Sequence, residues 1–313
     1  MGTSALSRLN HKIYSTAATL HVVKQTLVPN DILLAGPYAG ELGFELMEWS
    51  GYVRRLSAKY RRTIVISYAG HACLYDRCEY YPHDQSLVNS GYWYGSLAAK
   101  QINALMAPYV KTLGLTSFDW LHPTHLNRYA KRILGPQLFW EPFQTHRNQH
   151  RYDVAFHFRS LRRADLDEKN YPFEWARDLV NRCRAHGIRA CCIGHPQYAH
   201  SPDNCDDLRS SDLGQTREAL KGIRIVAGGS SAPMHLASLC GLPIVVWWKN
   251  SALDPELRDK YLGLWNPHRT PVFVVSDSTF QPPPEEVFSQ IIQALRSFQF
   301  SSGVSKNNAA SNV

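Results

Sequence analysis

The sequence predicts an α/β protein with two halves, each containing a parallel sheet and helices. Short apolar runs rich in β-branched residues alternate with longer segments whose apolar spacing is typical of helices. Strands that alternate with helices in this way pair in parallel through right-handed crossovers. The alternation stops at 139–151, a candidate linker without hydrophobic periodicity, and then restarts. A length of 313 residues is enough for two ordinary domains.

The first half is expected to begin with a strand, a glycine turn and a helix. Thr63 to Tyr68 is rich in β-branched residues, which favours a second strand. The expected elements are a strand at 31–36, a glycine turn at 40–43, a helix at 44–59, a strand at 63–68, and helical segments near 96–113 and 124–134. Residues 71–150 are aromatic and rich in histidine, and their strand order is not readable from the sequence.

The second half repeats the alternation of strand and helix. Its expected elements are strands at 153–158, 188–193, 223–227 and 244–248, helices at 173–185, 216–221 and 285–298, and a polar loop at 195–214. We therefore expect an N-terminal domain over 1–145 and a C-terminal domain over 146–300. The Ser/Asn-rich segment 301–313 is expected to be a disordered tail.

The most informative motif is the segment 228–243, which begins with a glycine pair between two apolar runs. Ser230 or Ser231 is suited to cap the helix that follows, and Pro233 suits its first turn. The exposed N–H groups and the dipole of such a helix start favour a phosphate. A tight structural turn without a ligand explains the glycines equally well. The residues predicted to bind a ligand here are Gly229, Ser230, Ser231, Met234 and His235, although Met234 has core spacing and a histidine in an apolar helix is more often satisfied internally.

A basic cluster follows the first strand of the second half. His157 and Arg159 lie on the same face of the extended chain. Arg159, Arg162 and Arg163 suit phosphate recognition because guanidinium groups match phosphate oxygens, and Arg159 is the strongest candidate because it lies closest to the strand. Lys169 precedes a helix and is a candidate phosphate contact as a point charge. A solvated basic loop is the competing interpretation of all four cations.

Two carboxylates lie in or directly after the N-terminal glycine turn. The turn lies where a strand ends and a helix begins, which is the edge at which open α/β sheets bind ligands. Glu41 and Glu45 are therefore candidates for a general base. A carboxylate at a helix N-terminus also stabilises the helix dipole by up to ~1 kcal/mol, so a structural role competes. Gly40, Gly43 and His157 complete the residues predicted for the acceptor side.

The composition limits the classes of ligand and location. A net charge of +8 and a pI of about 9.1 favour an anionic ligand such as a nucleotide sugar, a phosphorylated glycan or a nucleic acid, although a basic solvated face gives the same charge. No apolar run reaches the ~18 residues of a membrane span, and the first 30 residues lack the pattern of a signal peptide. The scattered cysteines favour reduced thiols, so a cytoplasmic location is expected.

Several motifs that carry chemistry are absent from the sequence. There is no HExxH or His-x-His pattern and no DxD pair at the end of a predicted strand, so no metal and no cofactor are expected. There is no Walker A loop and no GxSxG elbow. Gly36, Gly40 and Gly43 do not have the GxGxxG spacing of a nicotinamide-dependent enzyme.

The order of motifs over 153–248 resembles that of the C-terminal domain in GT-B glycosyltransferases of the heptosyltransferase-like family. Lys169–Trp175 is similar to the family's lysine-x-Trp-Pro-x-Glu helix start. Ser230–Ala237 is similar to its Asp-Ser-Gly-Pro-Met-His-Leu-Ala helix. Ser230 replaces the family's aspartate and Ala232 replaces its glycine. In addition, the element His157-x-Arg159 is similar to the strand end of fucosyltransferase-type GT-B enzymes, where the arginine binds the donor diphosphate.

The resemblance implies a GT-B fold, with two Rossmann-like lobes facing a cleft. It implies an inverting, metal-independent glycosyltransferase that moves a sugar from a nucleotide-diphosphate sugar to a hydroxyl acceptor. The C-terminal lobe would bind the donor through Arg159, Lys169 and the helix at Ser231. The N-terminal lobe would bind the acceptor, with Glu41 or Glu45 as the base.

The sequence leaves open the class of acceptor and two other functions. The acceptor is a glycan, a lipid-linked sugar or a modified DNA base, and for the last the aromatic segment 80–93 suits stacking on bases, although aromatic residues more often pack a core. Ser230 in place of the family's aspartate motivates a non-catalytic nucleotide- or glycan-binding module of GT-B ancestry. A sugar-nucleotide epimerase is a weaker third interpretation.

Overall fold

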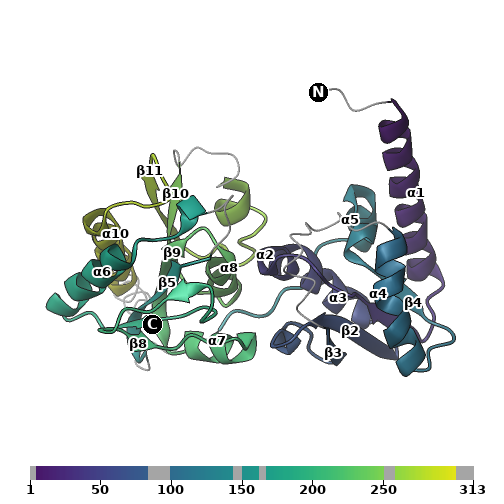
Figure 1. The fold of residues 1–313 in the computed structure, drawn as a ribbon, viewed down its shortest axis with the longest axis horizontal. Coiled ribbons are helices and arrows are strands. Elements are labelled where there is room, and N and C mark those ends of the chain that lie inside the picture. The colour runs from purple at the N-terminus through teal and green to yellow at the C-terminus, as the bar shows by residue number, and fades with distance from the viewer. Residues whose placement is uncertain (1–4, 84–98, 144–149, 162–166, 250–257, 301–313) are drawn as a thin grey trace, which may run out of the picture. The chain divides into compact units, whose positions relative to one another are not determined.

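The computed structural model describes residues 5–83, 99–143, 150–161, 167–249 and 258–300 (Figure 1). The chain divides into two compact units, Met1–Phe139 and Trp140–Val313, which we call unit 1 and unit 2. The predicted tail at 301–313 lies outside the described residues.

Unit 1 contains a four-stranded, fully parallel sheet with the strand order β3-β2-β1-β4. Its strands are β1 (Ile32–Ala35), β2 (Arg62–Tyr68), β3 (Glu79–His83) and β4 (Asp119–Leu121). Leu34, Ile64 and Ile66 form a buried cluster on one face, and Met106 and Val110 of helix α4 (Ala99–Thr112) pack against it. The predicted strands at 31–36 and 63–68 are confirmed, whereas β3 and β4 were not expected.

Helix α1 (Ala5–Leu27) was not expected, because no helix was predicted before residue 31. The helix packs against α5 (Arg128–Leu134) and the short turn of 3-10 helix that precedes it. Two polar side chains of α1 bond to a single backbone oxygen, because His21 Nε2 and Gln25 Nε2 lie 2.6 and 2.7 Å from the carbonyl oxygen of Trp120. Polar contacts with a distant segment therefore help to hold this helix in place. Such contacts cannot be predicted from the spacing of apolar residues.

The helix predicted at 44–59 is divided into three segments. It begins as α2 (Leu42–Phe44), continues as one turn of π-helix (Glu45–Trp49) and ends as α3 (Ser50–Ser57). The π-helical turn is visible in the bond from the Ser50 amide to the Glu45 carbonyl, which spans five residues. Isolated π-helical turns are frequent at functional sites, because they re-aim side chains within a helix.

Unit 2 is built on a seven-stranded sheet with the order β11-β10-β9-β5-β6-β8, and the short strand β7 pairs antiparallel to β5. The other neighbours are parallel. The strands are β5 (Tyr152–Arg159), β6 (Ala190–Cys192), β7 (Ala199–His200), β8 (Asp206–Asp207), β9 (Ile223–Gly229), β10 (Ile244–Lys249) and β11 (Val272–Asp277). The sequence missed β11 and assigned β7 and β8 to a loop.

Helices cover both faces of this sheet (Figure 1). They are α6 (Phe173–Ala185), α7 (Leu213–Leu220), α8 (Ala232–Leu239) and α10 (Pro284–Phe300). On the face covered by α6 and α10, strand residues such as Phe156 and Trp247 join the main apolar cluster. Met234 of α8 lies against the opposite face, beside Gly228. The predicted helix at 173–185 has the observed bounds.

Candidate functional site

The strand order of unit 2 reverses between β5 and β9. From β5 the chain proceeds through β6 to β8 on one side, and it then returns to β9, β10 and β11 on the other side. In open α/β sheets, ligands bind at the carboxyl ends of the strands at such a switch point. His157 of β5 pairs with Gly228 of β9 in register, so Arg159 and Ser231 follow at this edge. The topology therefore brings together two motifs that lie about 70 residues apart in the sequence.

The hydroxyl of Ser231 connects these two motifs. Its Oγ lies 2.9 Å from Nδ1 of His157 and donates to the carbonyl oxygen of Gly229 at 2.8 Å. Burial and the nearby charge of Arg159 lower the pKa of His157 to about 3. His157 is consequently neutral at physiological pH, and it acts here as a buried connection between β5 and the start of α8.

The N-terminus of α8 has no side-chain cap. Ser231 occupies the N-cap position, but its hydroxyl is used by Gly229 and His157 and makes no capping bond to the helix. Pro233 lies in the first turn, where a missing N–H costs nothing. Residues 230–233 are all partly exposed. The Met234 amide donates to the Ser231 carbonyl at 3.1 Å, so the cap residue accepts through its backbone and not through its side chain. The helix start therefore presents the positive end of its dipole without a side-chain cap, an arrangement suited to an anion.

The glycine pair belongs to β9, which corrects the prediction of a glycine turn. A Cβ on Gly228 would lie 2.8 Å from Sδ of Met234, and a Cβ on Gly229 would lie 2.8 Å from Nε1 of Trp247. Both glycines are thus needed for close packing on the two faces of the sheet. Met234 has 0% exposure, so its side chain supports the helix from the core.

Ser230 and His235 belong to an aromatic cluster beside the helix start. The Tyr261 hydroxyl donates to Ser230 Oγ at 3.0 Å, and the Tyr261 ring stacks on His235 with a centroid distance of 4.6 Å. Trp265 contacts the same imidazole edge-on at 4.9 Å. Burial and the charge of Lys260 lower the pKa of His235 to about 3. His235 is therefore a neutral interior ring rather than a surface cation.

Two described cations from the predicted cluster lie near the ends of the strands in unit 2. Arg159 is the last residue of β5 and is partly exposed. Lys169 Nζ lies 4.8 Å from the ring centroid of Phe280, just after β11. Lys249, which the sequence analysis did not single out, ends β10 and bonds to Glu168 at 3.0 Å. The only feature of the sequence that could have indicated Lys249 is its position directly after the apolar run 244–248. Arg162 and Arg163 lie outside the described residues.

The strand order of unit 1 also reverses, between β1 and β4. The chain proceeds from β1 to β2 and β3 on one side, and β4 pairs on the other side of β1. The predicted glycine turn begins directly after β1. Gly40 lies against the ring of Tyr38, whose hydroxyl donates to the carbonyl oxygen of Glu41 at 2.7 Å. Glu41 is exposed, and Gly43 is partly exposed within α2.

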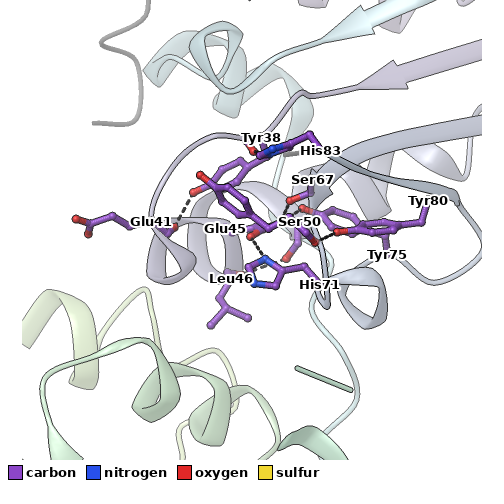
Figure 2. Close-up of polar contacts among 11 residues, drawn as sticks. Tyr38, Glu41, Glu45, Leu46, Ser50, Ser67, His71, Tyr75, Tyr80 and His83 are labelled. Atoms are coloured by element: carbon purple, nitrogen blue, oxygen red, sulfur yellow. Dashed lines mark hydrogen bonds and ion pairs between the residues drawn. The ribbon is translucent and has the colours of Figure 1, made fainter. Parts of the chain in front are cut away.

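The two candidate carboxylates of the turn have opposite environments, as Figure 2 shows. Glu41 points away from the cluster, whereas the side chain of Glu45 has 0% exposure. Glu45 Oε1 accepts bonds from Ser67 at 2.5 Å and from Tyr75 at 2.6 Å, and Oε2 lies 2.6 Å from Nδ1 of His71. These partners were not predicted from the sequence, because they come from β2 and the segment after it, 22 to 30 residues from Glu45.

The described part of the chain contains no group of three His, Cys, Asp or Glu side chains arranged to hold a metal ion. A search of the same residues found no helix that is both long enough and apolar enough to cross a membrane. The free thiols Cys192 and Cys205 have their sulfur atoms 3.4 Å apart.

No protein-family model matches the sequence, and no curated protein matches it. The structure is similar to that of a family 9 glycosyl transferase from Veillonella parvula, with a TM-score of 0.53 and 11% identity over 85% of this chain and 97% of that chain. The chain has a GT-B fold. A second similar structure is ADP-heptose lps heptosyltransferase II from E. coli, with a TM-score of 0.49 and 16% identity over 86% of this chain and 100% of that chain.

The GT-B fold is assigned from the similarity to the Veillonella parvula structure and from the parallel sheets of the two units. The predicted fold class of two Rossmann-like lobes is therefore confirmed, as is the resemblance to heptosyltransferase-like GT-B proteins. At 11% identity the likeness concerns the fold, and the chemistry has to be argued from the side chains of this GT-B chain.

Proposed function

We propose that this GT-B chain is a glycosyltransferase that moves a sugar from a nucleotide-diphosphate sugar to a hydroxyl acceptor. Unit 2 binds the donor, and unit 1 supplies the base that removes the acceptor's proton. The observation that carries the proposal is the start of α8, whose cap residue makes no capping bond and which follows the strand-order reversal of a Rossmann-like sheet.

The donor's diphosphate is proposed to bind at the N-terminus of α8, near Arg159 and Lys169. Amide groups at a helix start and fixed cations stabilise negative charge that develops on a leaving diphosphate. Gly229, Ser230 and Ser231 shape the backbone at this point, while Met234, His157 and His235 support it from the interior. This arrangement supplies the charge stabilisation that a divalent cation supplies in other enzymes, so we propose that transfer proceeds without a metal.

The base is proposed to lie at the carboxyl edge of the sheet in unit 1, beside the turn that contains Gly40 and Gly43. An exposed carboxylate such as Glu41 is able to contact an acceptor hydroxyl directly. Glu45 has no exposed side-chain surface and reaches a substrate only through a partner. Direct displacement by the activated hydroxyl inverts the anomeric carbon, which NMR of the product tests through the coupling constant of its anomeric proton.

A panel of nucleotide sugars in EDTA tests the proposal. We expect the purified chain to be thermally stabilised by one of the ADP-, GDP-, UDP- or dTDP-sugars and to release the nucleoside diphosphate from it. The absence of both responses across the panel contradicts the proposal. Stabilisation without release, in the presence of candidate acceptors, would instead support a non-catalytic binding module, the alternative suggested by Ser230 in place of the family's aspartate. Release of an isomerised donor would indicate an epimerase.

The acceptor class is proposed to be a glycan rather than a DNA base. The predicted base-stacking segment includes Tyr80 and Tyr81, but Tyr80 stacks on Tyr75 with a centroid distance of 5.9 Å, and Tyr81 packs on the core of unit 1. The other two aromatic residues of that segment, Tyr92 and Trp93, lie outside the described residues. Duplex DNA binding that weakens steeply with added salt, together with transfer to a hydroxymethylated duplex, would favour the nucleic-acid acceptor instead.

A further inference from the structure

Glu45 and His71 form a carboxylate–histidine pair in unit 1. Glu45 Oε2 lies 2.6 Å from Nδ1 of His71. The side chain of Glu45 has 0% exposure and that of His71 has 13%. Consequently, the carboxylate is covered by protein, whereas the side chain of His71 keeps some exposed surface.

The hydrogen bonds of Glu45 determine which nitrogen of His71 carries a proton. Ser67 and Tyr75 both donate to Oε1. Burial and the nearby carboxylate raise the pKa of the Tyr75 hydroxyl, so this residue stays a donor. Oε2 then accepts the N–H of His71 Nδ1, which leaves a lone pair on Nε2 of the neutral ring. Within the part of the chain that the structure describes, Nε2 has no hydrogen-bond partner.

The pair lies at the edge of the sheet where a ligand is expected. Glu45 follows the turn after β1, and His71 follows the end of β2 at Tyr68. Strands β1 and β2 are parallel neighbours, so both segments leave the sheet at its carboxyl edge. The Tyr68 ring contacts His71 edge-on at 5.5 Å, which together with Glu45 fixes the orientation of the imidazole.

We propose that His71 is the general base of the sugar transfer and that Glu45 is the residue that positions it. Nε2 takes the proton of the acceptor hydroxyl while the hydroxyl oxygen bonds to the anomeric carbon. The bond between that carbon and the diphosphate oxygen breaks, and its electron pair leaves with the nucleoside diphosphate. The imidazolium is stabilised by the adjacent carboxyl group of Glu45 and later returns its proton to water. This inference rests on the proposed function.

The variant His71→Asn separates the proton transfer from the structural contact. The asparagine amide retains a donor near the position of Nδ1 but has no counterpart of Nε2. We expect kcat to fall by about 10²- to 10⁴-fold while the KM for the donor changes little. His83→Gln is the matched control, because His83 lies in the same unit and contacts the Tyr38 carbonyl through Nε2 at 2.5 Å, a bond that glutamine retains. This control is expected to keep kcat within about threefold of the wild-type value.

The role of Glu45 is tested by a double variant. If Glu45 acts only through His71, Glu45→Gln slows the wild-type enzyme by about 10-fold or more but does not slow His71→Asn further. A purely structural role for Glu45 predicts that the two losses multiply. Should His71→Asn fail to fold, His71→Gly with added imidazole replaces it, and a rise in kcat of at least about 10-fold supports the base assignment.

The outcomes distinguish this inference from the proposed function. If the wild-type chain releases no nucleoside diphosphate from any donor of the panel, the function fails and the base assignment fails with it. If the wild type is active and His71→Asn retains a third or more of its kcat, only the inference is wrong. A large loss in Glu41→Gln combined with an active His71→Asn would assign the base to Glu41.

Discussion

The hydroxyl of Ser231 bonds to His157 on the neighbouring strand instead of capping the helix that it precedes. The distance from Oγ to Nδ1 of His157 is 2.9 Å, and the same hydroxyl donates to the Gly229 carbonyl. A serine at this position ordinarily satisfies one of the free amides of the helix start. Here the serine hydroxyl is engaged with β5 and β9, so the start of α8 is left without a side-chain cap, and its positive dipole end faces a ligand without that competitor.

Ser231→Ala is expected to destabilise the chain, because it leaves Nδ1 of the buried His157 without its partner. Loss of a partner from a buried polar group costs about 1–3 kcal/mol. Urea unfolding followed by circular dichroism measures the change, with Ser289→Ala on the exposed face of α10 as the control. A free energy of unfolding equal to that of the control would show that the contact with His157 contributes nothing.

Arg159→Gln is expected to weaken binding of the nucleoside diphosphate from the donor that the panel identifies. A hydrogen bond to a charged group contributes about 1.5–3 kcal/mol, so the Kd is expected to rise by about 10- to 100-fold. Isothermal titration calorimetry measures the Kd. The matched variant Arg177→Gln removes an exposed guanidinium from α6 and is expected to bind as tightly as the wild type. Equal affinities for both variants would remove Arg159 from the donor site.

Gly229→Ala is expected to destabilise unit 2, because the new Cβ would lie 2.8 Å from Trp247 Nε1 in the packed core. Overpacking of a core costs about 1–3 kcal/mol. Gly222→Ala is the control, since its nearest neighbours outside the adjacent residues lie at 3.6 Å or more. Thermal and urea unfolding compare the two variants. Equal free energies of unfolding for Gly229→Ala and Gly222→Ala would contradict the prediction, because Trp247 would then make room for the new methyl group without loss of stability.

Buried histidines predict that stability decreases as the pH falls below about 6.5. Burial lowers the pKa of His122, His157 and His235 to about 3, and each is 4% exposed. Their pKa values in the folded state lie below the unfolded value of 6.5, so the unfolded chain binds more protons between these limits. At pH 5 each buried histidine then costs about 2 kcal/mol relative to pH 7.

Urea midpoints measured from pH 7 to pH 5 test this dependence. His235→Phe retains an aromatic ring against Tyr261 but cannot take up a proton. This variant is expected to lose about 2 kcal/mol less stability over the same interval. A slope equal to that of the wild type would show that His235 is already accessible to protons in the folded state.

Elements with a strong local pattern were predicted well, and elements held by distant contacts were not. The helix at 173–185 has an amphipathic pattern, and the strands near 153–158 and 223–227 are short runs of mostly apolar residues, so each has the predicted type. Helix α1 depends in part on His21 and Gln25, whose partner is the backbone of Trp120. The prediction that the glycine pair forms a turn was wrong, because its close neighbours Trp247 and Met234 are contributed by other elements.

The carboxylate–histidine pair illustrates the same limit within the site. Glu45 was a candidate because it follows a glycine turn, but His71 is separated from it by 26 residues and belongs to no motif. Its one local signal was a position three residues after a predicted strand.

Hydrophobic periodicity and the order of glycine and proline residues were enough to predict an α/β chain of two halves with parallel sheets, because burial of apolar faces is encoded residue by residue along each element. The partners of Glu45, the exposure of Glu41, and the use of the Ser231 hydroxyl by His157 depend on which strands become neighbours. Such contacts join residues 22 to 74 positions apart, and pairing in a parallel sheet is decided by the packing of the whole lobe.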